Sequence, residues 1–188
     1  MGFEFYLRSV LLGVGLAMDA CAVSMASGFK EPKMPYKKTL LIASFFGAFQ
    51  GIMPLIGYFV GYALLSAILK VIPWISLIIL SFLGGKMIKD GINGDAEEVK
   101  TLTIGTLFVQ AIATSLDALS VGFTMADYKI VSALVCALII AVETFIISVV
   151  GVKIGKKFGT ALGGKAEIAG GIILILIGLE IFITKIFF

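Results

Sequence analysis

One short motif, a carboxylate inside an otherwise apolar segment, occurs twice in this chain of 188 residues. The first copy, MDACAVS, holds Asp19, and the second, LDALSVG, holds Asp117, which follows 98 residues later. An ionised side chain near the centre of a bilayer costs about 2.5–3.5 kcal/mol on insertion scales. A sequence that places a carboxylate there twice, in the same local context, predicts a function for both.

The segments around both aspartates are typical of membrane spans, because the whole chain is far more apolar than a soluble domain. Hydrophobic residues make up 60% of it and charged residues 14%, whereas about a quarter of a soluble domain is charged. A membrane-spanning helix needs roughly 20 apolar residues. We predict an all-α membrane protein with six transmembrane helices, at about 5–27, 39–64, 71–89, 101–126, 130–153 and 167–187.

The breaks between these helices predict the orientation of the chain. The second and fourth breaks, at 70–73 and 127–129, read as tight turns, and the third, at 90–100, includes the solvated acidic run DAEE. Breaks one, three and five, with the adjoining helix ends, hold eleven lysines, while the opposite side holds four lysines and arginines. The side richer in lysine and arginine faces the cytoplasm. Both termini are therefore expected outside the cytoplasm.

The duplication extends beyond the two aspartates and predicts a repeat of three helices. Two further pairs of motifs recur at an offset of 94 residues: GYFVG with GVKIG, and LGGK with IGLE. Because three is an odd number, the second copy must enter the membrane from the opposite side. Residues 1–94 and 95–188 are thus expected to form two inverted three-helix repeats of one membrane domain, as in secondary transporters.

The polar residues inside the predicted spans indicate a metal site built from oxygen atoms. Histidine is absent, and the two cysteines stand alone in apolar segments. Pro54 cannot donate a hydrogen bond to the carbonyl group of Gln50, so this carbonyl is freed beside a side-chain amide. Carboxylate, carbonyl and hydroxyl oxygens suit Mg²⁺, Ca²⁺ and Mn²⁺. The expected ligands are Asp19, Asp117, Glu143, Gln50 and Thr144.

Neighbouring residues refine this expectation. Thr114 and Ser120 lie three residues from Asp117 in sequence, so both hydroxyl groups should share its helix face. Lys86 and Glu180 occupy repeat-related positions. The two side chains could form an ion pair, or their charged ends could each reach the membrane surface, and both interpretations are as well supported as a role in function.

The motifs GLAMDACAVS, FFGAFQGIMPLIGYFVG, LGGKMI, AIATSLDALSVG and AEIAGGIILILIG together resemble the bacterial manganese efflux pumps (MntP), which are related to the lysine-exporter superfamily. The resemblance covers the whole chain. It implies a cytoplasmic-membrane exporter of Mn²⁺, with acidic residues on the transport path that match Asp19, Asp117 and Glu143. Some members have glutamate at the position of Gln50, so a site with four carboxylates does not carry over.

We therefore expect divalent-cation export by alternating access, with no enzymatic activity and no cofactor. Three ionised carboxylates would repel one another, so the empty site should retain a proton that a divalent cation expels. This favours proton antiport, although uniport remains open. The lysines form no basic, aromatic-rich face, which argues against a nucleic-acid partner. Faces of small residues suit internal packing and homo-oligomerisation equally.

Two alternatives belong to other classes of substrate or activity. An amino-acid exporter of the lysine-exporter type would need intramembrane cations to hold the substrate carboxylate, and Lys86 is the one candidate. An intramembrane aspartyl protease also needs two carboxylates on different helices, but no GxGD or YD element surrounds Asp19 or Asp117.

Overall fold

The computed structural model describes residues 2–60, 62–93, 103–125, 128–162 and 165–187, and every regular element in these ranges is helical. The all-α prediction is confirmed. The acidic run at 95–98 and the predicted boundary between residues 94 and 95 lie outside the described residues. The helices are α1 (Phe3–Lys30), α2 (Tyr36–Phe59), α3 (Tyr62–Asn93), α4 (Ile104–Thr114), α5 (Leu116–Thr124), α6 (Ile130–Leu162) and α7 (Lys165–Phe187).

Several of these helices have the length and apolarity of membrane spans. Among the described residues four stretches qualify, and Ile168–Glu180 is a shorter apolar helix. Large apolar side chains also cover their outer surfaces, as expected for contact with lipid. The chain is a multi-pass membrane protein. The four stretches are Phe3–Lys30, Tyr36–Phe59, Ile104–Thr124 and Ile130–Gly159.

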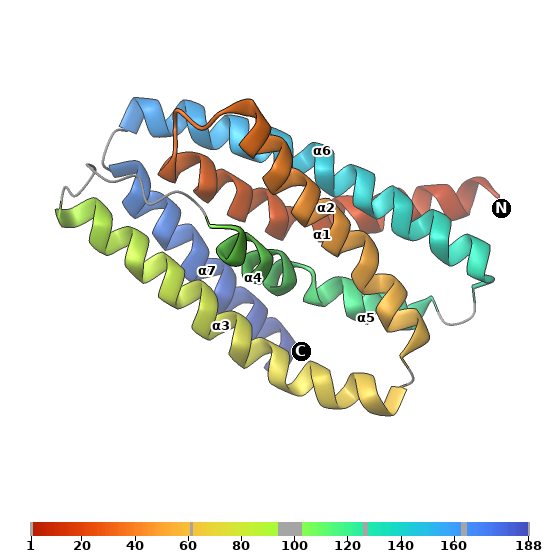
Figure 1. Ribbon diagram of the computed structural model, residues 1–188. Helices are drawn as coiled ribbons and strands as arrows, with labels where there is room; N and C mark the ends of the chain where they lie inside the picture. The colour runs from red at the N-terminus through yellow and green to blue at the C-terminus, as the bar shows by residue number, and fades with distance from the viewer. Residues whose placement is uncertain (1, 61, 94–102, 126–127, 163–164, 188) are drawn as a thin grey trace.

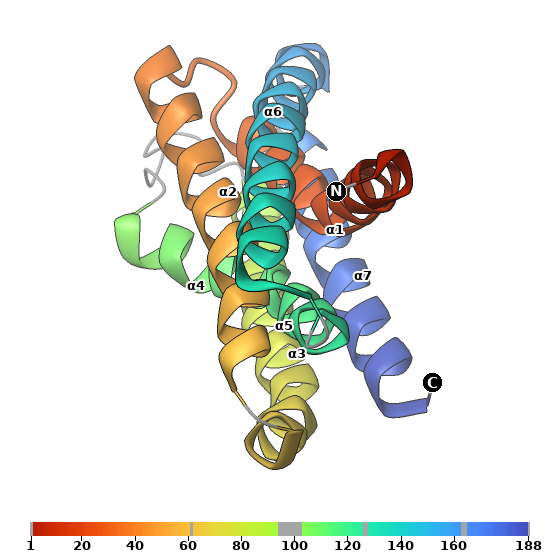
Figure 2. The same cartoon turned by 90° about the vertical axis from the view of Figure 1, so that its right-hand side faces the viewer.

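The helices form one bundle in which the chain direction alternates. Figure 1 shows α1, α3 and α6 running one way, and α2, the α4–α5 pair and α7 running the other way. The most extensive pairings are α1 with α6 and α3 with α7, while α2 lies against both α6 and α5. Figure 2 shows α6 between α2 and α1.

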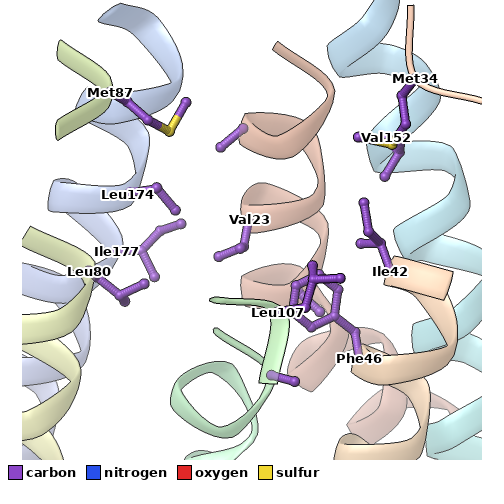
Figure 3. Close-up of a cluster of buried hydrophobic side chains, with 13 residues drawn as sticks. Val23, Met34, Ile42, Phe46, Leu80, Met87, Leu107, Val152, Leu174 and Ile177 are labelled. Carbon is purple, nitrogen blue, oxygen red and sulfur yellow. The ribbon is translucent and has the colours of Figure 1, made fainter. Parts of the chain in front are cut away.

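A buried apolar cluster makes α1 the central helix of the bundle. In Figure 3, Val23 of α1 lies between Leu174 and Ile177 of α7 on one side and Ile42 of α2 on the other. Leu107 of α4 joins the same cluster from below. The face of α1 that includes Val23 therefore points into the protein interior.

Glycines allow α1 and α6 to approach closely. A Cβ atom at Gly28 would lie 2.5 Å from the carbonyl oxygen of Val152 and 2.8 Å from the backbone nitrogen of Lys156. A Cβ atom at Gly151 would lie 2.7 Å from the carbonyl oxygen of Cys21. These distances are too short for any side chain, so the two backbones pack directly on each other, as small residues permit in membranes.

This packing also explains why α6 is longer than predicted. The sequence predicts that this helix ends near residue 153 and that a connection leads to the next helix at 167, but α6 continues to Leu162. A Cβ atom at Gly159 would lie 3.1 Å from the carbonyl oxygen of Phe29 in α1. The glycines that read as a connection are thus part of a helix interface.

Two other predicted boundaries are wrong. The chain reverses between the end of α2 at Phe59 and the start of α3 at Tyr62, and α3 then passes through Pro73, where a tight turn was expected. A proline inside a helix removes one backbone hydrogen bond, but membrane helices tolerate this loss because their surroundings compensate for it. The helix predicted at 101–126 is instead interrupted at Ser115, between α4 and α5.

Candidate metal-ion site

Asp117 lies directly after the interruption between α4 and α5. Ser115 leaves the helical conformation, with φ −105° and ψ 8°. Its hydroxyl group donates a hydrogen bond to the carbonyl oxygen of Ala111 at 2.7 Å, which satisfies a carbonyl at the end of α4. The carboxylate of Asp117 is half-buried in the first turn of α5, where the backbone N–H of Ala118 donates to its Oδ1 at 2.8 Å. Free N–H groups at a helix start favour a negative charge there.

The interruption corrects the expectation about the hydroxyl groups beside Asp117. Thr114 belongs to α4 and not to the helix of Asp117, and its hydroxyl group donates to the carbonyl oxygen of Gln110 at 3.0 Å. Ser120 remains in α5 and is half-buried. One of the two predicted hydroxyl neighbours therefore stabilises the broken helix end instead.

Asp19, in contrast, lies within the uninterrupted helix α1 and is half-buried. Helix periodicity places it on the same face as Val23 and Ala26, two residues of the buried cluster that joins α1 to α7 and α4. Leu16, one turn before Asp19, shares a second apolar cluster with Ala118, which follows Asp117. Residues beside both aspartates therefore contribute to one buried cluster.

Gln50 connects α2 to this part of α1. It is fully buried, and its Nε2 donates a hydrogen bond to the carbonyl oxygen of Leu16 at 2.8 Å. Its Oε1 has no hydrogen-bond partner among the described residues. One turn later, Pro54 packs against Gly122 of α5, where a Cβ atom would lie 2.8 Å from the proline Cα. Gln50 thus faces the interior close to α1 and not the lipid.

Glu143 of α6 lies against a different part of α1. Its Oε2 is buried and unpartnered within the described ranges, and it occupies the space where a Cβ atom at Gly13 would be. Gly13 precedes Asp19 by six residues, which corresponds to about 9 Å along the helix axis. No three Asp, Glu, Cys or His side chains of the described residues lie close enough to hold one ion together. Glu143 is therefore not clustered with the two aspartates.

Buried oxygen atoms without a partner follow the helices around these carboxylates. Thr144 is fully buried beside Glu143, and its hydroxyl oxygen is unpartnered among the described residues. Three further residues share this property, although the sequence did not single them out: Ser24, Gln110 and Ser148. The sequence signal that could have identified them is a polar residue within an apolar span. Such oxygens are suited to contact with water or an ion inside the bilayer.

Lys86 and Glu180 do not pair with each other. In the antiparallel contact of α3 with α7, a Cβ atom at Gly171 would lie 2.5 Å from the carbonyl oxygen of Gly84, which places Lys86 near Gly171. Glu180 follows Gly171 by nine residues, about 13 Å along α7. Both side chains are exposed. This placement does not fit the expected ion pair. It fits the other expectation, in which both side chains reach toward the membrane surface.

The oxygen-rich interior can be compared with known proteins. A protein-family model described as "Putative manganese efflux pump" matches residues 33–182. No solved structure matches the chain significantly.

Similar proteins come from distant organisms, and the alignments cover nearly the full length of both chains. A protein of Rippkaea orientalis is 44% identical over 179 residues, which are 94% of this chain and 95% of that protein; its name is "Putative manganese efflux pump MntP". A protein of Clostridium botulinum named "Putative manganese efflux pump MntP 2" is 46% identical over 93% of this chain and 92% of its own. A Methanosphaera stadtmanae protein with the first name is 42% identical over 93% of this chain and 97% of its own.

Proposed function

Because the chain belongs to the MntP family of manganese efflux pumps, we propose that it exports manganese(II) across the cytoplasmic membrane by alternating access. The observation that carries this proposal is a multi-pass bundle with two half-buried aspartates, one in an intact and one in an interrupted helix, whose neighbours Leu16 and Ala118 belong to one buried cluster. The names of the relatives give no support to amino-acid export or to proteolysis.

In the proposed site, Asp19 and Asp117 supply the charge that compensates a manganese ion for its lost hydration. Gln50, Glu143 and Thr144 supply further oxygens from the junction of α1, α2 and α6, so the ion meets them in succession along a polar path. Interrupted helices are typical of transporter sites because they expose backbone groups and helix ends to the substrate. The break at Ser115 supports this assignment on the Asp117 side.

The proposed architecture is six transmembrane helices in two inverted repeats, 1–94 and 95–188, with α4 and α5 as one interrupted span. Two backbone contacts support it: Gly57 packs on the carbonyl of Leu119, and Gly151 packs on that of Cys21. Gly57 and Gly151 are 94 residues apart, and Cys21 and Leu119 are 98 apart. These are the offsets of the sequence motifs, as expected if one contact is the repeat of the other.

The same site is proposed to couple manganese export to proton movement. Carboxylates brought near one another in a poorly hydrated interior repel, which favours retention of a proton by the empty site and its release when a divalent cation binds. Export would then proceed by exchange of manganese for protons, with both termini outside the cytoplasm. A transmembrane pH gradient that drives manganese movement in proteoliposomes is the expected behaviour.

Neutral variants of the two aspartates test the function. Asp19→Asn and Asp117→Asn preserve shape but remove an anionic oxygen, so each should abolish manganese export while the protein still inserts. Glu180→Gln is the matched control, because it also neutralises a carboxylate within a helix, but one that is exposed and not half-buried. Manganese sensitivity of cells, with membrane abundance checked by immunoblot, is the measurement. Abundant aspartate variants that still protect cells from manganese would show that these carboxylates do not hold the ion.

A further inference from the structure

A polar cavity lies at the end of the bundle where α1 and α3 end and α4 begins. Its volume is about 80 Å³, and its lining includes Lys30, the last residue of α1, and Lys86 of α3. Thr103, Thr106 and Gln110 line it from the start of α4, where they share one helix face. Two ammonium groups repel a metal cation, so this cavity is unsuited to the manganese ion itself.

Two features of α4 indicate a polar ligand in this cavity, and the first of them favours an anion. Thr103 is the N-cap residue of the 11-residue helix, and its side chain makes no capping hydrogen bond. The Thr103 side chain therefore does not occupy the first backbone N–H groups of α4, where the helix dipole favours a negative ligand. Gln110 is only 3% exposed, and its Oε1 has no hydrogen-bond partner in the described part of the chain. Because this oxygen accepts hydrogen bonds, it indicates a missing polar ligand that also carries a donor group.

An apolar groove lies beside this cavity. It has a volume of about 360 Å³ and runs between α3 and α4, where Ile78, Phe82 and Val109 line it. Leu83 and Thr106 line both the cavity and the groove, so the two are adjacent. Ile78 and Phe82 are 65% and 71% exposed, which places the groove on the lipid-facing surface. A basic pocket with an adjoining apolar channel matches a charged headgroup followed by an acyl chain.

We propose that this composite site binds an anionic phospholipid, with its phosphate in the polar cavity and one acyl chain in the groove between α3 and α4. The phosphate accepts hydrogen bonds from the N-terminal N–H groups of α4 and from the threonine hydroxyls, and Lys86 with Lys30 supplies the charge complement. Basic pockets between transmembrane helices recognise such headgroups. The lipid would hold α4 against α3 and thereby stabilise the half-helix that leads to Asp117.

Two substitutions separate the headgroup from the acyl chain. Lys86→Gln removes one charge, and Lys89→Gln is its control, because Lys89 is an exposed lysine of α3 that does not line the cavity. Gly105→Phe fills the groove, and a Cβ atom there meets no other atom within 4 Å, so the helix tolerates it. Gly85→Phe is the control, because Gly85 is equally open but does not line the groove.

The experiment measures the unfolding temperature of the full-length protein in detergent during titration with phosphatidylglycerol, phosphatidylcholine or inorganic phosphate. Phosphatidylglycerol should raise it more than phosphatidylcholine, and inorganic phosphate should have little effect. Lys86→Gln should weaken the apparent affinity about fivefold, since one lysine near an anionic lipid contributes about 1 kcal/mol and about 1.4 kcal/mol corresponds to tenfold. Gly105→Phe should remove most of the shift, while both controls keep it.

Three results would overturn the proposal. Equal stabilisation by both lipids would show that no anionic headgroup is recognised. Full stabilisation by inorganic phosphate, unchanged in Gly105→Phe, would show a site for a free anion and not for a lipid. A loss of stabilisation in the controls that matches the loss in the test variants would show a nonspecific effect. No manganese enters this assay, so its outcome is independent of the proposed export function.

Discussion

Two glycines of α1 at the same interface with α6 should respond differently to substitution by alanine. At Gly28 an added Cβ meets backbone, 2.5 Å from the carbonyl oxygen of Val152 and 2.9 Å from the Cα of Gly155. At Gly13 the nearest atoms belong to the carboxylate end of Glu143, which can rotate away, and the closest backbone atom, the Cα of Ile140, is 3.3 Å from the added Cβ. The added methyl group is the same in both variants, so the difference isolates the rigidity of what it meets.

The magnitude follows from two opposing terms. Overpacking a tight interface typically lowers the free energy of unfolding by about 1–3 kcal/mol. Replacing glycine by alanine inside a helix raises it by up to about 1 kcal/mol. Gly28→Ala should therefore lose about 1–2 kcal/mol, because α1 and α6 must move apart. Gly13→Ala should be close to neutral, because displacing a flexible side chain is cheap compared with moving a backbone.

Thermal unfolding in detergent, followed by circular dichroism, measures this difference. For a chain of about 150–250 residues, 1 kcal/mol corresponds to about 2–4 °C, so Gly28→Ala should unfold about 2–8 °C lower than the unmodified protein. Gly13→Ala serves as the internal control for the introduced methyl group. An unchanged unfolding temperature for Gly28→Ala, or equal losses in both variants, would refute the direct backbone packing of α1 on α6.

The remaining predictions concern the helix break, the interhelical amide and the topology. Ser115→Ala removes the hydroxyl bond to the Ala111 carbonyl and should destabilise the protein by about 1 kcal/mol, seen as a lower unfolding temperature; no change would mean that the break does not depend on this bond. Gln50→Leu leaves the Leu16 carbonyl without its donated bond and should lower manganese export less than either aspartate variant does; full export would remove Gln50 from the path. A reporter that is active only in the cytoplasm should be inactive when fused after Phe188, and activity would reverse the orientation.

Much of the fold could be read from apolar length, since a bilayer demands long apolar helices whatever their neighbours are. The first helix and the start of α6 lie close to their predicted positions. Errors arose where local signals have two meanings. Pro73 signals a turn in water but lies within α3, and Gly159 signals a connection but packs on α1. Neither outcome is decided by the residue alone, because each depends on which helix lies next to it.

The candidate site shows the same division. A carboxylate inside an apolar span is visible in the sequence because it is costly, and Asp19 and Asp117 were found in this way. The break before Asp117 was missed, although Ser115 replaces the alanine found at the repeat-related position 17. A serine can cap a helix end or lie within a helix, and its bond to the Ala111 carbonyl distinguishes these outcomes only in three dimensions.

The sequence by itself determined the class of protein, the two intramembrane aspartates and the preference for oxygen ligands, because these follow from composition and residue chemistry. Only the tertiary structure decided which residues meet. It places Gln50 on the Leu16 carbonyl, and it places Glu143 against Gly13, away from Asp19. The physical reason is that helix periodicity fixes the face on which a side chain lies, whereas the axial register and rotation of neighbouring helices depend on close glycine contacts formed by residues far apart in the chain.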